Sequence, residues 1–134
     1  MKPLYTPEYI TELKPNEIFV YGSNQFAKHG AGSARVARDK FGARYGQCPM
    51  GLLGQSYGII TKSFTEMPVS LEFIKAQIQA LYYFALLRQD LTFYVTKIGT
   101  ALAGFSIEEI ATIFKTCMPF KPTNIILPIE FSNQ

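Results

Sequence analysis

The sequence has few of the residues that build metal centres and disulfide frameworks. Among its 134 residues there are two cysteines, Cys48 and Cys117, and a single histidine, His29. Two cysteines form neither a disulfide framework nor a four-ligand zinc site, and His29 has no second histidine with which to share a metal ion. We therefore expect no metal and no cofactor.

Long apolar runs are also missing. The first twenty residues contain five charged side chains, which excludes the apolar core of a secretory signal peptide: Lys2, Glu8, Glu12, Lys14 and Glu17. No run approaches the roughly eighteen apolar residues of a membrane span. The sequence therefore predicts a cytoplasmic protein with reduced thiols and no membrane partner.

Charge is sparse, whereas hydrophobic residues are plentiful. Charged residues make up 17% of the chain and the net charge is +3, far from the basic excess of a dedicated nucleic-acid binder. Nucleic acid is therefore not the expected partner. The 48% hydrophobic content supports a real core, and the length fits one domain over residues 1–134.

Four short apolar runs, rich in β-branched and aromatic residues, predict strands that are covered on both faces, at 18–21, 57–61, 91–96 and 124–127. Helical patterns fall between them at 33–41 and 70–88, and a third helix opens at Ser106 and ends before Pro119. Ser33 is expected to cap the first helix, and Ser106 with Glu109 reads as a capping box. This alternation predicts a three-layer α/β/α sandwich with a mainly parallel central sheet.

Two stretches fall outside this pattern. Residues 1–16 fit either an edge element or a wrapping arm. Residues 42–58 carry five glycines and no clear periodicity. They are expected to form a long loop, and long loops in compact domains are often functional.

Two glycine-bearing loops, at 22–33 and 98–104, follow predicted strands and lead directly into helices. Such loops meet at the carboxyl edge of a parallel sheet, where free N–H groups and the helix dipole attract anions. Lys28, Lys62 and Lys97 are expected to make this mouth positive. The loop lacks the Gly-Lys-Ser/Thr of a P-loop, and Arg35 stands where the dinucleotide fingerprint needs glycine. The pattern thus indicates a phosphate site outside these two motifs.

Three segments resemble the macro-domain superfamily: FVYGSN at 19–24, HGAGSA at 29–34, and KIGTALAG at 97–104 followed by SIEEI. The resemblance implies a macro-domain-like fold that binds ADP-ribose or a related phosphate-bearing nucleotide. It places Asn24 beside the distal ribose and the two glycine-bearing loops along the diphosphate. The ligand-binding residues it implies are Gly22, Ser23, Asn24, Gly30, Ala31, Gly32, Ser33, Gly99, Thr100, Ala101, Leu102 and Ala103.

The family contains both readers and hydrolases, and this chain departs from one catalytic pattern. Ala103 stands where one hydrolase branch carries aspartate, and Ala101 replaces that loop's second glycine. Binding is therefore better supported than hydrolysis of ADP-ribosyl derivatives, for which Asn24 and His29 are the catalytic candidates. Each has a plainer alternative, because Asn24 could hydrogen-bond its own turn and His29 could be an exposed loop residue.

Two other functions stay open at this stage. The chain could bind nucleic acid or RNA ends through a basic segment with a neighbouring aromatic residue, made of Arg35, Arg38, Lys40, Arg44 and Tyr45. It could also be a protein-interaction domain that kept the fold without an active pocket. The sequence leaves open the physiological ligand, any bond that is cleaved, and the oligomeric state.

Overall fold

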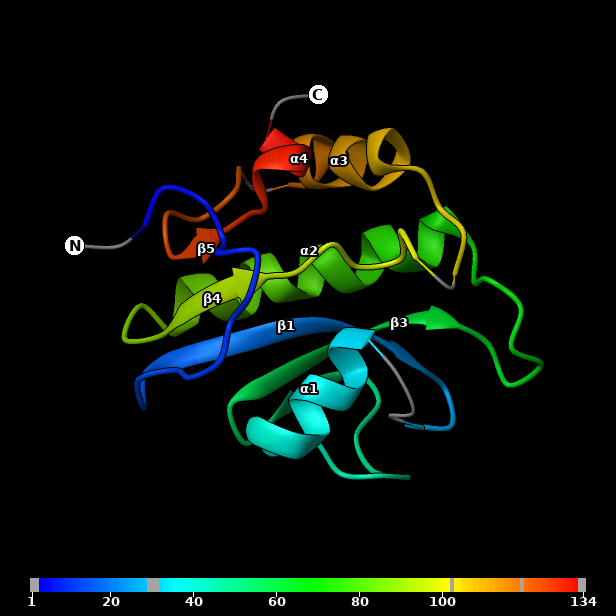
Figure 1. The fold of residues 1–134 in the computed structure, drawn as a ribbon. Helices are drawn as coiled ribbons and strands as arrows, with labels where there is room; N and C mark the ends of the chain where they lie inside the picture. The colour runs from blue at the N-terminus through cyan, green and yellow to red at the C-terminus, as the bar shows by residue number, and fades with distance from the viewer. Residues whose placement is uncertain (1–2, 29–31, 102, 119, 133–134) are drawn as a thin grey trace.

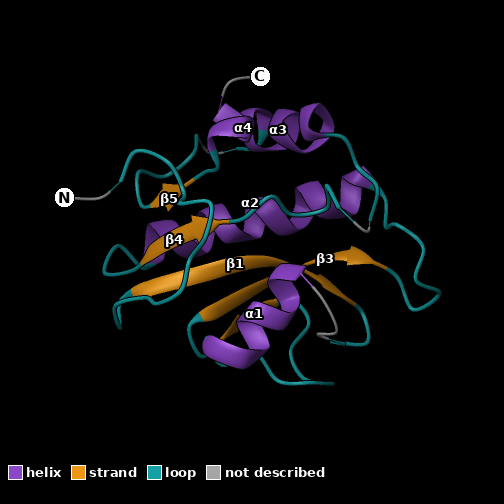
Figure 2. Ribbon diagram, viewed as in Figure 1, coloured by secondary structure: helices purple, strands orange, loops and turns teal. Residues whose placement is uncertain are grey.

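The computed structural model describes residues 3–28, 32–101, 103–118 and 120–132. The chain forms an α/β fold in which strands and helices alternate (Figures 1 and 2). The elements are β1 (Glu17–Asn24), α1 (Gly32–Lys40), β2 (Gly51–Leu53), β3 (Ser56–Lys62), α2 (Leu71–Leu87), β4 (Thr92–Val95), α3 (Ile107–Thr116), β5 (Ile125–Ile126) and α4 (Ile129–Ser132).

The sheet has five strands in the order β2-β3-β1-β4-β5. Strands β3, β1, β4 and β5 run parallel, and β2 pairs antiparallel with β3 at one edge. Tyr94 of β4 is paired with Phe19 of β1, so these two strands are neighbours. The mainly parallel sheet expected from the sequence is confirmed.

Helices cover both faces of the sheet, as Figure 1 shows. Alternate residues of β1 point to opposite faces. Ile18 and Val20 join a large apolar core with α2 and α3, whereas Phe19 and Tyr21 join a smaller cluster with Ala37 of α1. The coarse α/β sandwich follows from this division. Within the described residues, no helix is long and apolar enough to cross a membrane.

Residues 3–16, called the N-terminal arm from here on, contain neither helix nor strand. The arm is tied to the end of the sheet by Thr6, whose N–H donates to Leu127 O at 2.9 Å and whose hydroxyl donates to Ile126 O at 3.0 Å. Farther along, Ile10 and Leu13 pack against the smaller apolar cluster. The arm therefore covers part of the same face as α1.

Serine side chains cap the starts of α2 and α3, whereas α1 differs from its prediction. Ser70 caps α2, and the Ser106–Glu109 capping box opens α3 as predicted. The prediction for α1 was wrong, because this helix already begins at Gly32 and Ser33 lies inside it. Gly32 has φ +59, a left-handed conformation that glycine adopts without strain.

The prediction of a long loop at 42–58 was also wrong, because this stretch contains β2 and the hairpin that joins β2 to β3. Gly54 turns this hairpin with φ +61. Its Cα lies against Gly42, where an added Cβ would come within 3.1 Å of it. The glycines therefore serve a tight turn and a close backbone approach. The four-residue α4 was not predicted either.

Candidate functional site

The carboxyl ends of β3, β1 and β4 lie side by side and form the floor of the candidate site. Thr61 at the end of β3 donates its hydroxyl to Ser23 O at 3.1 Å, and Thr96 beyond β4 donates to Val20 O at 2.8 Å. Gly22 sits between them, and a Cβ added there would lie 3.5 Å from the amide nitrogen of Gly99. Gly22, expected to open the first loop, lies within β1. The end of this strand therefore lies against the second glycine-bearing loop, at the sheet edge that the parallel topology predicts.

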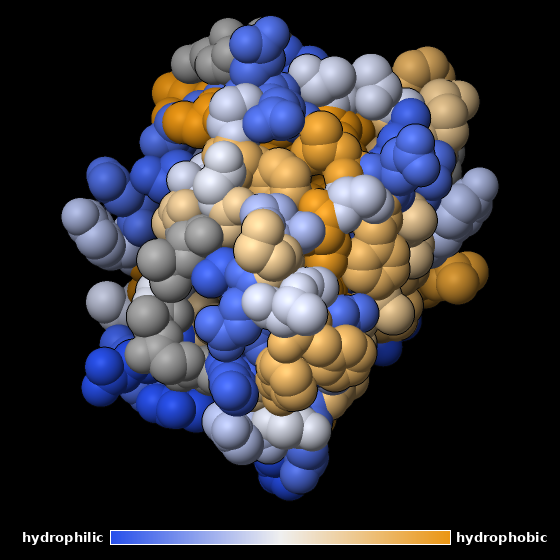
Figure 3. All heavy atoms as spheres, turned by 90° about the vertical axis from the view of Figure 1, so that its right-hand side faces the viewer, coloured by the Kyte–Doolittle hydropathy of each residue, from blue (hydrophilic) through white to orange (hydrophobic). Residues whose placement is uncertain are grey.

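A first cavity of about 340 Å³ opens at this edge. Figure 3 looks onto this side of the molecule, where hydrophilic and hydrophobic side chains are interleaved. The cavity brings together eight sequence-predicted ligand residues, namely Gly22, Ser23, Asn24, Gly32, Ser33, Gly99, Ala101 and Ala103. Four other predicted site residues, His29, Gly30, Ala31 and Leu102, lie outside the described residues.

Asn24 uses its side chain to close its own loop. Its Nδ2 donates to Lys28 O at 2.9 Å, and its Oδ1 accepts from Lys28 N at 3.0 Å. Its backbone carbonyl accepts from Ala27 N at 2.9 Å, and Ala27 has φ +53. The plainer sequence interpretation, a turn-forming asparagine, thus describes what the side chain does. One N–H and one lone pair are left for a ligand, so ligand contact by Asn24 stays a prediction.

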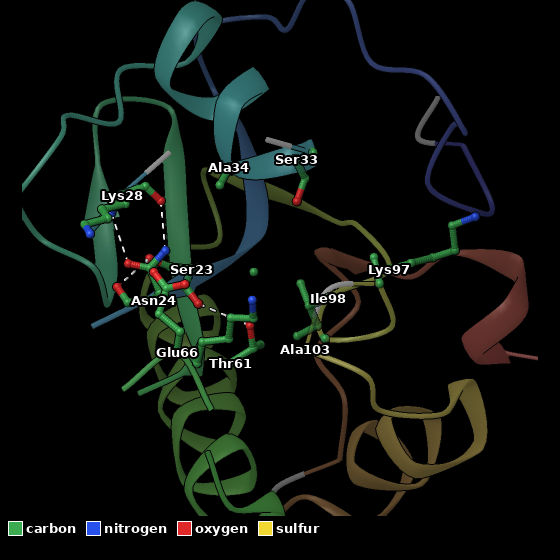
Figure 4. A pocket seen from close by; sticks show the side chains of 15 residues that line it. Ser23, Asn24, Lys28, Ser33, Ala34, Thr61, Glu66, Lys97, Ile98 and Ala103 are labelled. Carbon is green, nitrogen blue, oxygen red and sulfur yellow. Dashed lines mark hydrogen bonds between the residues drawn. The ribbon is translucent and has the colours of Figure 1, made fainter. Parts of the chain in front are cut away.

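The ammonium groups of Lys28 and Lys97, two of the lysines expected at the mouth, interact with other side chains of the protein. The Lys28 ammonium lies over the Phe26 ring, 4.9 Å from its centroid, and the Lys97 ammonium is 3.5 Å from a carboxylate oxygen of Glu130. Figure 4 shows both side chains extending away from the middle of the cavity. The expected positive mouth is therefore partly neutralised. Backbone N–H groups become the better candidates to hold an anion there.

The described residues of the second glycine-bearing loop, 97–101 and 103–105, are linked by hydrogen bonds within the loop. Phe105 N donates to Gly99 O at 2.9 Å, and the Thr100 hydroxyl donates to Lys97 O at 2.9 Å. Gly99 has φ +74 and packs against Phe105 and Ile110, where an added Cβ would lie 3.1 and 3.4 Å from their side chains. The described part of 99–104 presents no titratable side chain to the cavity.

Glu66 also lines the first cavity and was not among the predicted site residues. Glu66 follows β3 in a tight turn and has φ +63, uncommon for a residue other than glycine. The end of the strand at 57–61 marked this loop as part of the mouth. No motif, however, distinguishes Glu66 from an ordinary solvated acid.

A second cavity of about 1110 Å³ adjoins the first and was not predicted. It lies between the N-terminal arm, α1, the 96–107 segment and the start of α4. The two cavities share Gly32, Ser33, Lys97 and Ala101. Thr100, expected at the phosphate, lines the second cavity. Apolar side chains dominate its inner wall, among them Phe19, Val36, Phe105 and Ile107.

No family model matches the sequence, and no curated protein matches it. The structure is similar to that of a protein of unknown function from Bacteroides thetaiotaomicron, with a TM-score of 0.67 and 14% sequence identity. The match covers 88% of this chain and 90% of the other. At this identity, the similarity shows a shared fold. Within the part of the chain that the structure describes, no three histidine, cysteine or acidic side chains are placed to hold a metal ion.

Proposed function

We propose that this chain is a macro-domain-like module that binds ADP-ribose or a closely related nucleotide diphosphate across its two adjoining cavities. The observation that carries the proposal is the close approach of the end of β1 to the second glycine-bearing loop. Gly22 and Gly99 lie against one another, and the first turn of α1 lines the same cavity. This arrangement agrees with the sequence resemblance at 19–34 and 97–110.

The shared part of the two cavities suits a diphosphate. It consists of Gly32 and Ser33 at the positive end of α1, a nine-residue helix, together with Lys97 and Ala101. A Cβ added at Gly32 would meet nothing within 4 Å, so the backbone there is open to an approaching ligand. Exposed N–H groups at a helix N-terminus attract anions without a dedicated cationic side chain.

The second cavity suits a nucleobase. Its apolar and aromatic lining offers surface for a planar ring, and Glu8 and Ser106 add polar groups at its rim. Because it adjoins the diphosphate position on the β4 and β5 side, the opposite end at Asn24 is left for the distal ribose. An elongated ligand would thus follow the carboxyl edge of the sheet.

Binding is favoured over turnover. General acid–base help requires a titratable group within hydrogen-bond reach of the reacting atom. The described residues of 99–104 have no titratable side chain, the Thr100 hydroxyl is already donated to Lys97 O, and the Lys97 ammonium is paired with Glu130. The rival nucleic-acid function is weakened, because Arg35 and Arg38 both lie near the Asp39 carboxylate, at 3.6 and 3.2 Å. Hydrolysis of ADP-ribosyl derivatives, if present, would be slow.

Calorimetric titration with ADP-ribose and with a short single-stranded RNA, each at two salt concentrations, tests the proposal. We expect ADP-ribose to bind with one site and a shallow salt dependence. RNA should bind weakly and lose affinity steeply with salt, as counterion release requires. Tight, salt-sensitive RNA binding without ADP-ribose binding would favour the rival function. Binding of neither would favour a protein-interaction domain.

Two substitutions of Gly32 test whether the phosphates of the ligand bind beside it. Asn and Asp both tolerate a left-handed φ, so Gly32→Asn and Gly32→Asp should fold alike at a cost of about 1 kcal/mol. Only the aspartate places a negative charge beside the phosphates, which should weaken binding about 100-fold relative to Gly32→Asn. Gly51→Asp is the matched control, since Gly51 has φ +93, an open Cβ position and no place in either cavity. Equal affinities for Gly32→Asn and Gly32→Asp would place the phosphates elsewhere.

A further inference from the structure

We propose that Glu66 determines which group the first cavity accepts beyond the diphosphate. Its carboxylate would accept a hydrogen bond from a sugar hydroxyl and repel a further phosphate at the same position. The inference rests on the proposed function, because it concerns one end of the same ligand.

The sheet order places Glu66 at one end of the cavity. Asn24 of β1 is paired with Lys62 of β3, and Gln25 N donates to Lys62 O at 3.1 Å. The turn beyond β3 is joined to the same loop, because Phe64 N donates to Gln25 Oε1 at 3.0 Å. The loop that carries Lys97 and Gly99 follows β4, on the other side of β1. The cavity is therefore asymmetric along the edge of the sheet.

The close view of the cavity agrees with this order. In Figure 4, Asn24, Lys28 and Glu66 gather on one side, and Lys97 with Ala103 lies on the other. The diphosphate position proposed above lies toward the second group. Whatever is attached to the outer phosphate would thus face Glu66.

The backbone of the turn fixes the position of Glu66. Ser63 N donates to Met67 O at 2.8 Å, and Glu66 N donates to Ser63 O at 2.9 Å. Lys62 and Pro68 form a β-bridge that closes the base of the turn. Within this frame Glu66 is held at φ +63, a conformation that persists in residues other than glycine only where the surroundings enforce it.

The carboxylate of Glu66 itself favours a hydroxyl over a phosphate as its direct partner. It is the only acidic residue among the described residues that line the first cavity. Lys28 and Lys62 line the same cavity, but neither forms an ion pair with Glu66 among the described residues, and the Lys28 ammonium lies over Phe26. A carboxylate only accepts hydrogen bonds, so it pairs with hydroxyl groups and opposes another anion.

The neighbouring amide strengthens this assignment. Asn24 lines the cavity beside Glu66 and retains one N–H and one lone pair after closing its loop. Together the two side chains offer acceptors and a donor to a polyhydroxylated group. The structure thus favours a nucleoside diphosphate that ends in a sugar, such as ADP-ribose, over a nucleoside triphosphate.

The test compares ADP-ribose with ATP, which share the ADP part and differ in the group beyond it. We expect the wild-type protein to prefer ADP-ribose. Glu66→Gln should weaken ADP-ribose binding about tenfold, the usual consequence of losing a charged hydrogen-bond partner, without weakening ATP binding. The ratio of the two affinities should therefore narrow at least tenfold. Glu108→Gln is the control, because Glu108 is exposed and lines neither cavity.

The Glu66→Gly variant tests whether a loss of selectivity arises from misfolding of the turn. Glycine adopts φ +63 without strain, so this variant should unfold at the same or a higher urea concentration while showing the same loss of selectivity. A Glu66→Gln protein that keeps the wild-type affinity ratio would overturn the inference and leave ADP-ribose binding intact. A wild-type protein that binds no ADP-ribose would overturn the proposed function and this inference together.

Discussion

Among the described residues, the face of the sheet under α2 and α3 rests on a cluster of 21 buried hydrophobic residues, whereas the cluster under α1 and the N-terminal arm has five. The first face is closed by helices whose apolar residues interlock with β1, β3 and β4. The second is held partly by polar bonds, such as Tyr94 Oη to Glu17 Oε2 at 2.9 Å and Gln55 Nε2 to Lys14 O at 2.7 Å.

The face under α2 and α3 contributes most of the buried apolar packing, whereas the face under α1 and the N-terminal arm leaves room for a ligand. The second cavity reaches Phe19 and Val36, which belong to the thinly packed face. On the opposite face, the described residues of the larger cluster are at most 7% exposed. Ligand sites require open volume, and open volume lowers the packing contribution to stability. The two faces show this division within a single sheet.

The largest expected effect is on the densely packed face. Ile78 of α2 is fully buried in the larger cluster. Ile78→Ala should lower the free energy of unfolding by about 2–5 kcal/mol through lost burial and a residual cavity. Urea denaturation measures the loss, and the remaining folded protein should bind ADP-ribose with wild-type affinity. A loss below about 1 kcal/mol would show that this face is packed more loosely than its burial indicates.

An isoleucine-to-alanine substitution on the face under α1 and the N-terminal arm should lower the free energy of unfolding by less. Ile10 of the N-terminal arm is half-buried against the smaller cluster, so Ile10→Ala should lower stability by about 1–2 kcal/mol. It should also weaken ADP-ribose binding, because Ile10 lines the second cavity. Leu4→Ala, at a position 79% exposed in the same arm, is the control and should change neither quantity. A loss equal to that of Ile78→Ala would remove the distinction between the faces.

The sequence predicted the elements whose signals are local. The apolar runs at β1, β3 and β4 identified strands because a parallel strand is buried on both faces. The Ser106–Glu109 capping box identified the start of α3 because it satisfies N–H groups within four residues. The position of the second glycine-bearing loop beside the end of β1 followed from the alternation of strands and helices, since parallel strands end at one edge.

Other features depended on distant contacts. The β2 strand has three half-buried residues and a glycine at its start, so its signal is too weak to read without β3 beside it. The arm is placed by Thr6 and by packing on the sheet rather than by propensity. Glu66 enters the cavity through a left-handed turn that no pattern of residue types marks. The second cavity and part of the first therefore escaped prediction.

The smallest expected effect concerns a hydrogen bond on the face under α1 and the N-terminal arm. Tyr94 is buried and donates to Glu17, and burial together with this bond raises the pKa of the Tyr94 hydroxyl to about 12, from 10.0. Tyr94→Phe should lower stability at pH 8 by about 1 kcal/mol, the net value of one hydrogen bond. Tyr83→Phe is the control, because Tyr83 is 59% exposed on α2 and should tolerate the change.

The contribution of the Tyr94 hydroxyl to stability should decrease at high pH. A hydroxyl whose pKa is raised on folding keeps its proton more tightly in the folded state, so its contribution is complete below pH 10 and is lost as the pH rises toward about 12. Wild-type stability should therefore fall more steeply between pH 10 and 12 than that of Tyr94→Phe, and the gap between the two proteins should shrink. Urea denaturation at pH 8 and pH 11 measures both. Parallel pH profiles for the two proteins would mean that the Tyr94 hydroxyl is solvated, and that the face under α1 and the N-terminal arm is held by apolar contacts alone.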